Sequence, residues 1–146
     1  MALGNKKLGQ VAVVVRDMDA ALDRYSRLLG VERPDVIVTQ PGDEVNMSAY
    51  GGPSNARAKL AFFDLGGVQL ELIEPMGGES TWQKVLDEKG EGLHHIAFWQ
   101  EDYAATTEAL GDAGFSEVQR GDMGEGQYGY FLGEDGVMVE ILQAKR

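Results

Sequence analysis

The chain has two histidines, His94 and His95, which stand side by side in the stretch EGLHHIAF at residues 91–98. Cysteine is absent, so a disulfide framework and a thiol nucleophile are excluded, and any metal must be held by nitrogen and oxygen atoms. An imidazole accompanied by carboxylates and an amide oxygen suits a divalent ion such as Zn²⁺, Ni²⁺, Co²⁺ or Mn²⁺. The oxygen ligands of such a site must come from elsewhere in the chain.

An internal repeat supplies these candidate ligands. Laying LGQVAV over LHHIAF pairs Gln10 with His95, and laying FFDLGGVQLELI over FLGEDGVMVEIL pairs Glu71 with Glu140. Two modules related by a pseudo-two-fold axis would bring the first and last strands of each module together. We therefore predict that Gln10, Glu71, His95 and Glu140 bind one divalent metal ion.

His94 is expected to have no part in this site. Side chains alternate between the two faces of a strand, so His94 and His95 should point in opposite directions. The repeat selects His95, whereas His94 aligns with Gly9. We therefore interpret His94 as a structural residue.

The four residues predict a reaction as well as a metal. Four protein ligands leave two positions of an octahedral ion open for two neighbouring oxygens of a substrate. The ion would then act as a Lewis acid and stabilise the enolate formed when a proton leaves the carbon next to a carbonyl. Glu140 and Glu71 are the predicted catalytic residues, because a carboxylate at the edge of the shell can take that proton. The alternative is that each glutamate marks the solvated face of a half-exposed strand.

The elements that must position these residues occur in the same order twice. The first set is a strand at about 8–15, a helix over 17–30 capped by Asp17 or Asp19, and strands over 59–65 and 68–75 joined at Gly66–Gly67. The second set is a strand over 93–100, a helix over 101–114, and strands over 116–120, 128–133 and 136–143. The offset of the histidine strand also pairs Asp17 with Asp102. Residues 40–57 are expected to form a solvated connection or a lid.

Length and charge limit the domain organisation and the partners. A chain of 146 residues with 43% hydrophobic residues predicts one domain over 1–146, with module one at about 6–76, a connector helix at about 79–90 and module two at about 91–146. The net charge of −11 disfavours nucleic acid and anionic membrane surfaces. No stretch approaches the roughly 18 apolar residues of a membrane span. We expect a cytoplasmic protein with a small-molecule substrate.

The quoted motifs resemble the vicinal oxygen chelate superfamily over nearly the whole chain. This superfamily includes glyoxalase I, bleomycin-resistance proteins and extradiol dioxygenases, and the resemblance implies an α+β fold in which two βαβββ modules form a cup-shaped mixed sheet around a divalent metal. The stretch ELIEPMGGESTWQKVLDEKGEGLHHIAF looks most like the methylmalonyl-CoA epimerases. Family members often pair, so we also expect a homodimer.

The epimerase resemblance implies metal ligands at His95, Glu140 and Glu71. The first ligand of that pattern is normally a histidine, whereas Gln10 stands here, and the resulting set is similar to that of zinc-type glyoxalase I. Some bacterial epimerases have a second glutamate base at a position corresponding to about Leu60. An apolar residue there does not favour a two-base mechanism.

Three functions from different classes follow. The first is a metal-dependent isomerase or epimerase similar to methylmalonyl-CoA epimerase, acting on an acyl thioester or a hydroxy-carbonyl compound. The second is a lactoylglutathione lyase of the glyoxalase I type. The third is a non-catalytic ligand-binding protein that resembles the bleomycin-resistance proteins. A basic rim for an anionic substrate would draw on Arg57, Lys59, Lys84 or Arg120.

Overall fold

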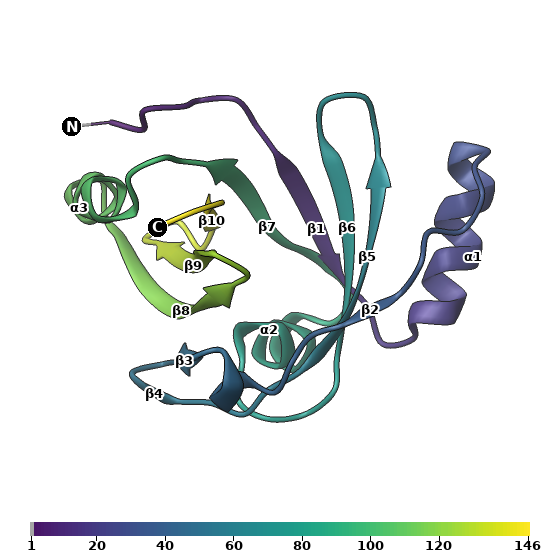
Figure 1. Ribbon diagram of the computed structural model, residues 1–146. Coiled ribbons are helices and arrows are strands. Elements are labelled where there is room, and N and C mark those ends of the chain that lie inside the picture. The colour runs from purple at the N-terminus through teal and green to yellow at the C-terminus, as the bar shows by residue number, and fades with distance from the viewer. Residues whose placement is uncertain (1) are drawn as a thin grey trace.

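The computed structural model describes residues 2–146, which form one curled ten-stranded sheet and three α-helices (Figure 1). The strands are β1 (Gln10–Val14), β2 (Ile37–Val38), β3 (Ser48–Ala49), β4 (Gly52–Pro53), β5 (Ala58–Asp64), β6 (Gln69–Pro75), β7 (Gly92–Trp99), β8 (Phe115–Met123), β9 (Gly126–Gly133) and β10 (Met138–Gln143). The helices are α1 (Met18–Leu29), α2 (Thr81–Lys89) and α3 (Tyr103–Asp112). Among these helices, none is long and apolar enough to cross a membrane.

The sheet is built from two halves that meet at β1 and β7. The strand order is β2-β5-β6-β1-β7-β10-β9-β8-β3-β4, in which β1 and β7 are antiparallel neighbours. The order β2-β5-β6-β1 in the first half is therefore repeated in reverse as β7-β10-β9-β8 in the second. Figure 1 shows the sheet curling between α1 at one side and α3 at the other. The predicted α+β fold with two βαβββ modules and a cup-shaped mixed sheet is confirmed.

The strand register follows the offsets of the sequence repeat. Ala12 of β1 and Ala97 of β7 are 85 residues apart, and they pair with Glu71 and Glu140, which are 69 residues apart. Ala12 also pairs with His95 across the junction between the two halves. The two glutamates therefore occupy equivalent places on either side of the central strands.

The N-terminal caps of α1 and α3 are equivalent residues of the repeat, Asp17 and Asp102. The side chain of Asp17 accepts a hydrogen bond from the backbone N–H of Ala20, and Asp102 does the same for Ala105 at the start of α3. Asp17, and not Asp19, is thus the cap of α1. Gly30 ends α1 with φ at 68°, a left-handed conformation that glycine adopts without steric cost.

Helices α1 and α3 cover the outer face of the sheet and leave the inner face for a site and for α2. Alternating strand residues send Leu72 and Phe63 to the outer face, where they pack with Leu22 of α1, and send Phe131 to meet Leu110 of α3. Each such side chain contributes about 1.5–3 kcal/mol on burial. The packing of α1 and α3 on the outer face holds in place the strands that carry the charged residues of the candidate site.

The segment over residues 40–57 is more structured than the sequence indicates. It contains a 3-10 turn at Gly42–Glu44 and the strands β3 and β4, and β3 pairs with β8 through Ser48 and Arg120. It is therefore a link between the two halves, and not only a solvated connection. The strand predicted over 116–120 also runs longer, as β8, because it pairs with β9 along most of its length.

Candidate metal centre

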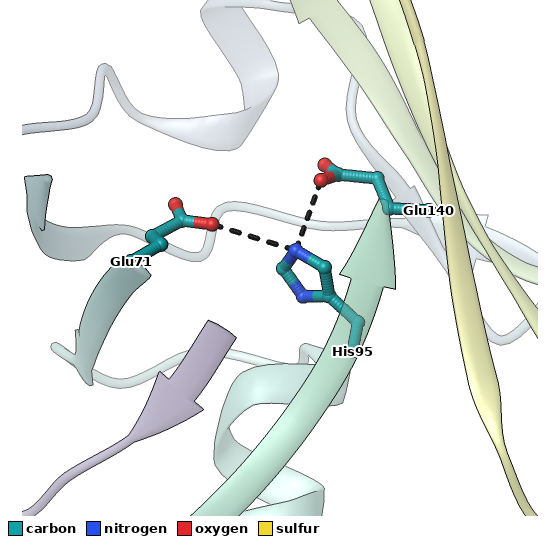
Figure 2. A group of neighbouring side chains, drawn as sticks. All are labelled: Glu71, His95 and Glu140. Carbon is teal, nitrogen blue, oxygen red and sulfur yellow. Dashed lines mark ion pairs between the residues drawn. The ribbon is translucent and has the colours of Figure 1, made fainter. Parts of the chain in front are cut away.

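Three side chains from three strands converge on one point of the inner face. His95 of β7 lies between Glu71 of β6 and Glu140 of β10, with its Nε2 atom 3.4 Å from Glu71 Oε1 and 3.0 Å from Glu140 Oε1 (Figure 2). One donor atom from each residue lies within 4.8 Å of the others. These strands meet because of the fold symmetry, which brings β6 and β10 to either side of the β1–β7 pair.

The three side chains are removed from solvent, and two of their atoms have no hydrogen-bond partner. His95 is 1% exposed, and Glu71 and Glu140 are each 5% exposed. Neither His95 Nε2 nor Glu140 Oε1 makes a hydrogen bond, although the two atoms are only 3.0 Å apart. When His95 is protonated, its Nε2 atom forms ion pairs with both carboxylates, and a divalent ion bound among the three side chains would replace that proton. One imidazole and two carboxylates are a donor set that fits a divalent ion.

The charged side chains of the cluster shift one another's pKa values. Burial lowers the pKa of His95, but the negative charges of Glu140 and Glu71 outweigh burial and raise this pKa to about 9. Burial raises the pKa of Glu140, and the neighbouring His95 opposes that rise. In the ion-free protein His95 is therefore protonated at neutral pH, and an ion that takes its Nε2 lone pair must displace that proton.

Gln10, the fourth predicted ligand, lies on β1 and lines the same cavity as Glu71 and Glu140. Its Nε2 atom donates a hydrogen bond of 3.0 Å to Oε1 of Gln69 on the neighbouring strand. The hydrogen bond uses the side-chain nitrogen of Gln10. The predicted metal ligand is the other end of the same amide, its carbonyl oxygen. The role of Gln10 as a ligand stays a prediction.

The prediction that His94 and His95 point in opposite directions is wrong. Ala12 pairs with His95 but the next residue, Val13, pairs with Leu93, so His94 is an extra residue on β7. Such a bulge breaks the alternation of side chains. Both rings are buried, and their Nδ1 atoms lie 2.8 Å apart.

His94 begins a buried hydrogen-bond network that the sequence did not indicate. Its Nε2 atom lies 3.1 Å from Oγ1 of Thr81, whose hydroxyl and backbone N–H both donate to Oε1 of Gln119. The Nε2 atom of Gln119 donates to the hydroxyl of Tyr128, a residue of the cavity wall. Burial and the charge of His95 lower the pKa of His94 well below its usual range, so this ring is neutral. No spacing rule joins residues 81, 94 and 119, because the network depends on the bulge.

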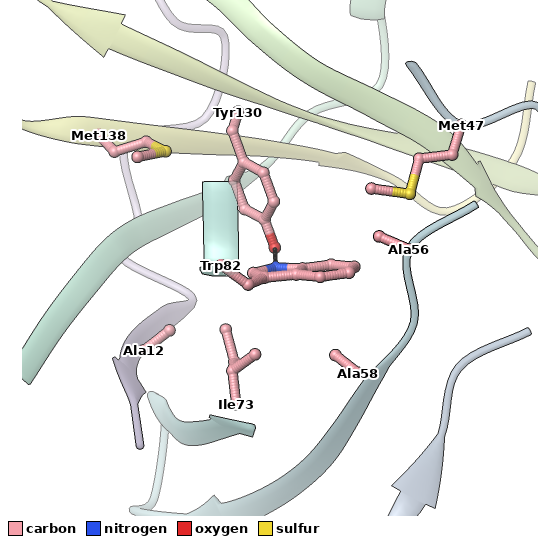
Figure 3. Packing of buried hydrophobic residues seen from close by; sticks show 8 residues of the cluster. All are labelled: Ala12, Met47, Ala56, Ala58, Ile73, Trp82, Tyr130 and Met138. Atoms are coloured by element: carbon pink, nitrogen blue, oxygen red, sulfur yellow. Dashed lines mark hydrogen bonds between the residues drawn. The ribbon is translucent and has the colours of Figure 1, made fainter. Parts of the chain in front are cut away.

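Helix α2 contributes directly to the site. Its Trp82 lines the cavity and donates a hydrogen bond of 3.0 Å from Nε1 to the hydroxyl of Tyr130, in the cluster drawn in Figure 3. The ring of Tyr130 packs against both histidines, with centroids 5.1 Å from His94 and 4.9 Å from His95. The predicted connector helix therefore supplies a wall of the site as well as a link between the two halves.

The cluster lies at a cavity of about 590 Å³, within the size range of small-molecule sites. Polar groups on its wall include Gln10, Glu71 and Glu140, whereas the rest is largely apolar. Leu60 is among the apolar wall residues.

Comparison with known proteins agrees with this fold. Residues 9–131 match the family model of the Glyoxalase/Bleomycin resistance protein/Dioxygenase superfamily. The chain belongs to this superfamily, as the sequence motifs predicted.

Within the superfamily the chain is similar to epimerases. It is 29% identical to the ethylmalonyl-CoA/methylmalonyl-CoA epimerase of Cereibacter sphaeroides over 144 residues, which cover 94% of this chain and 97% of that protein. It is 35% identical over 94 residues to an uncharacterised Bacillus subtilis protein, covering 61% of this chain and 67% of the relative. The structure of a Streptomyces coelicolor methylmalonyl-CoA epimerase variant in complex with 2-nitronate-propionyl-CoA has a TM-score of 0.65 and 25% identity, with 96% and 98% of the two chains covered.

Proposed function

We propose that this protein is a divalent-metal-dependent isomerase or epimerase that removes a proton from the carbon next to a carbonyl group. The observation that carries the proposal is the convergence of one buried imidazole and two buried carboxylates, His95, Glu71 and Glu140, at the polar end of a small-molecule cavity. The similarity to epimerases over nearly the whole chain supports the same class of reaction.

In this proposal Glu71, His95 and Glu140 hold the ion, with the carbonyl oxygen of Gln10 as the fourth protein ligand. The bound ion supplies a Lewis acid that stabilises negative charge on the carbonyl oxygen of the substrate. Glu140 or Glu71 takes the proton: the C–H bond breaks, its electron pair enters the carbonyl system to give an enolate, and the proton moves to a carboxylate oxygen. Return of a proton to carbon completes an isomerisation or an epimerisation.

Trp82 and Tyr130 form part of the cavity wall beside the two carboxylates. Trp82 and Tyr130 are 5% and 3% exposed and are held together by their hydrogen bond. In the ion-free protein burial raises the pKa of the Glu140 carboxyl, whereas His95 and Tyr130 lower it.

A test of the proposal is hydrogen exchange at the substrate carbon. The protein, loaded with Zn²⁺ or Co²⁺, should incorporate deuterium from D₂O into methylmalonyl-CoA or into a small hydroxy-ketone, followed by NMR. Glu140→Gln and Glu71→Gln should lower the exchange rate by about 10²-fold or more where the carboxylate is the base. Glu108→Gln, an exposed residue of α3, is the matched control and should leave the rate unchanged. Absence of exchange with every compound by a loaded protein would contradict the proposal and favour a non-catalytic binding protein.

The lyase of the glyoxalase I type is the second candidate, and its support is the residue set glutamine, glutamate, histidine and glutamate at positions 10, 71, 95 and 140. It predicts thioester formation from methylglyoxal and glutathione by the loaded protein, measured by absorbance. The expected homodimer and the cytoplasmic location stay predictions.

A further inference from the structure

The cavity beside the metal cluster has no cationic side chain on its wall. Of residues 2–146, those that line it include neither a lysine nor an arginine. Sites that bind carboxylate or phosphate groups of a substrate usually provide such side chains, because a buried anion without a partner is costly. The polar groups of the wall are amides, hydroxyls and carboxylates.

The cations predicted for a basic rim are engaged elsewhere. Their contacts are Arg57 Nε to the Thr39 carbonyl at 3.0 Å, Lys59 to Glu74 at 3.5 Å, Lys84 Nζ over the Tyr50 ring at 4.4 Å, and Arg120 to Glu117 at 3.7 Å. Lys7 lies in a separate hollow that shares only Gln69 and Trp99 with the cavity. These cations therefore do not compensate a charge at the inner end of the cavity.

The candidate metal site formed by Glu71, His95 and Glu140 would have no surplus positive charge once a divalent ion is bound. Glu71 and Glu140 carry two negative charges between them, which cancel the two positive charges of a divalent ion, while Gln10 and a metal-binding His95 are uncharged. A substrate that added its own carboxylate would give the buried site a net negative charge. An uncharged substrate would keep the site neutral until the proton leaves.

The remaining wall favours an apolar body on that substrate. Leu60, Phe62 and Trp82 line the interior, and Ile37 and Trp99 lie at the cavity with 52% and 40% of their surface exposed. Trp99 covers Gly9 so closely that a Cβ atom there would lie 2.9 Å from the indole. Exposed apolar side chains beside a cavity are typical of a site that binds apolar ligands.

We propose that the substrate of this site is an uncharged hydroxy-ketone with an aromatic or branched apolar body, and not a carboxylate-bearing acyl thioester. The inference rests on the proposed function, because it places two neighbouring oxygens of the substrate toward the metal cluster. It follows from three observations: two carboxylates that already cancel the charge of a divalent ion, the absence of cations on the described wall, and the apolar interior.

The test compares two ligands with the same body. Protein loaded with Zn²⁺ is titrated with 2-hydroxyacetophenone, which is uncharged, and with mandelate, which carries a carboxylate. The uncharged compound should bind at least about tenfold more tightly, and Glu71→Gln should reduce this ratio about tenfold because it removes one negative charge. Leu60→Lys should also shift the preference toward mandelate, whereas the matched variant Leu60→Gln should not.

Hydrogen exchange separates the two proposals. If the loaded protein exchanges the proton of methylmalonyl-CoA faster than that of 2-hydroxyacetophenone, or binds mandelate more tightly, the substrate inference is overturned and the proposed function stands. If it exchanges neither proton, the proposed function fails and the inference fails with it. Exchange with 2-hydroxyacetophenone alone, together with its tighter binding, is the result that both proposals predict.

Discussion

The Nδ1 atoms of His94 and His95 lie 2.8 Å apart, which makes one buried histidine the hydrogen-bond partner of the other. A single proton between the two nitrogens joins the rings, and the opposite nitrogen of His95 faces the two glutamates. A metal-binding histidine is commonly held in this way by a partner on its second nitrogen, which fixes both the tautomer and the orientation of the ring. The bulge at His94 places that partner within the same strand.

Loss of the His94 ring should therefore weaken metal binding without removing a ligand. We expect His94→Ala to lower the affinity for Zn²⁺ about 10–100-fold, measured by competition with a chelator. His94→Phe, which restores the volume but not the hydrogen bond, should show the same loss. An affinity within about twofold of the original in the folded His94→Phe protein would contradict the positioning role.

Metal affinity should rise with pH, because the ion competes with a proton. The pKa of His95 in the ion-free protein is lowered by burial but raised more by Glu140 and Glu71, to about 9. Below that pH the ring carries a proton that the ion must displace, so the apparent affinity should increase about tenfold per pH unit and level off above about pH 9. Calorimetry at pH 7 in two buffers of different ionisation enthalpy should detect about one proton released per ion. An affinity that is independent of pH over this range would contradict the assignment.

The fold was predicted from the family resemblance together with the internal repeat, which carries long-range information. The offsets that relate Glu71 to Glu140 and Asp17 to Asp102 reappear in the strand register and in the helix caps. A repeat of this kind indicates which strands are neighbours in the sheet. Local hydrophobic patterns alone do not carry that information.

The interior of the site was predicted less well, for physical reasons. The place of His94 depends on a bulge that arises only when β7 pairs with β1, so strand alternation gave the wrong direction. The contact between Trp82 and Tyr130 joins a helix to a distant strand, and no periodicity relates the two residues. The link between β3 and β8 likewise rests on the two residues of β3, too short a segment for a periodic pattern to indicate.

The contact between Trp82 and Tyr130 should contribute to stability in a way that a double-mutant cycle can measure. Trp82→Phe leaves the buried hydroxyl of Tyr130 without its donor, so the free energy of unfolding in urea should fall by roughly 1–3 kcal/mol in addition to any packing loss. In the background of Tyr130→Phe the same change should cost less, because no hydroxyl is left unsatisfied. Equal costs in both backgrounds would show that the hydrogen bond contributes nothing.

The contact between Gln10 and Gln69 gives a test of the fourth ligand. Gln10→Ala removes the amide oxygen and should weaken binding of Zn²⁺ about tenfold or more, whereas Gln69→Ala removes only its support and should weaken binding less. Chelator competition measures both. Unchanged affinity in Gln10→Ala would restrict the metal shell to Glu71, His95 and Glu140.

The central claim is that the buried cluster holds one divalent ion, and metal content measures it most directly. Untagged protein purified without chelator is analysed by elemental mass spectrometry beside His95→Ala, Glu140→Ala and the surface control Glu108→Gln. We predict about one ion per chain in the original protein and the control, and almost none in the two cluster variants. Protein that takes up no Zn²⁺, Ni²⁺, Co²⁺ or Mn²⁺ on incubation, or variants that retain the ion, would contradict the claim.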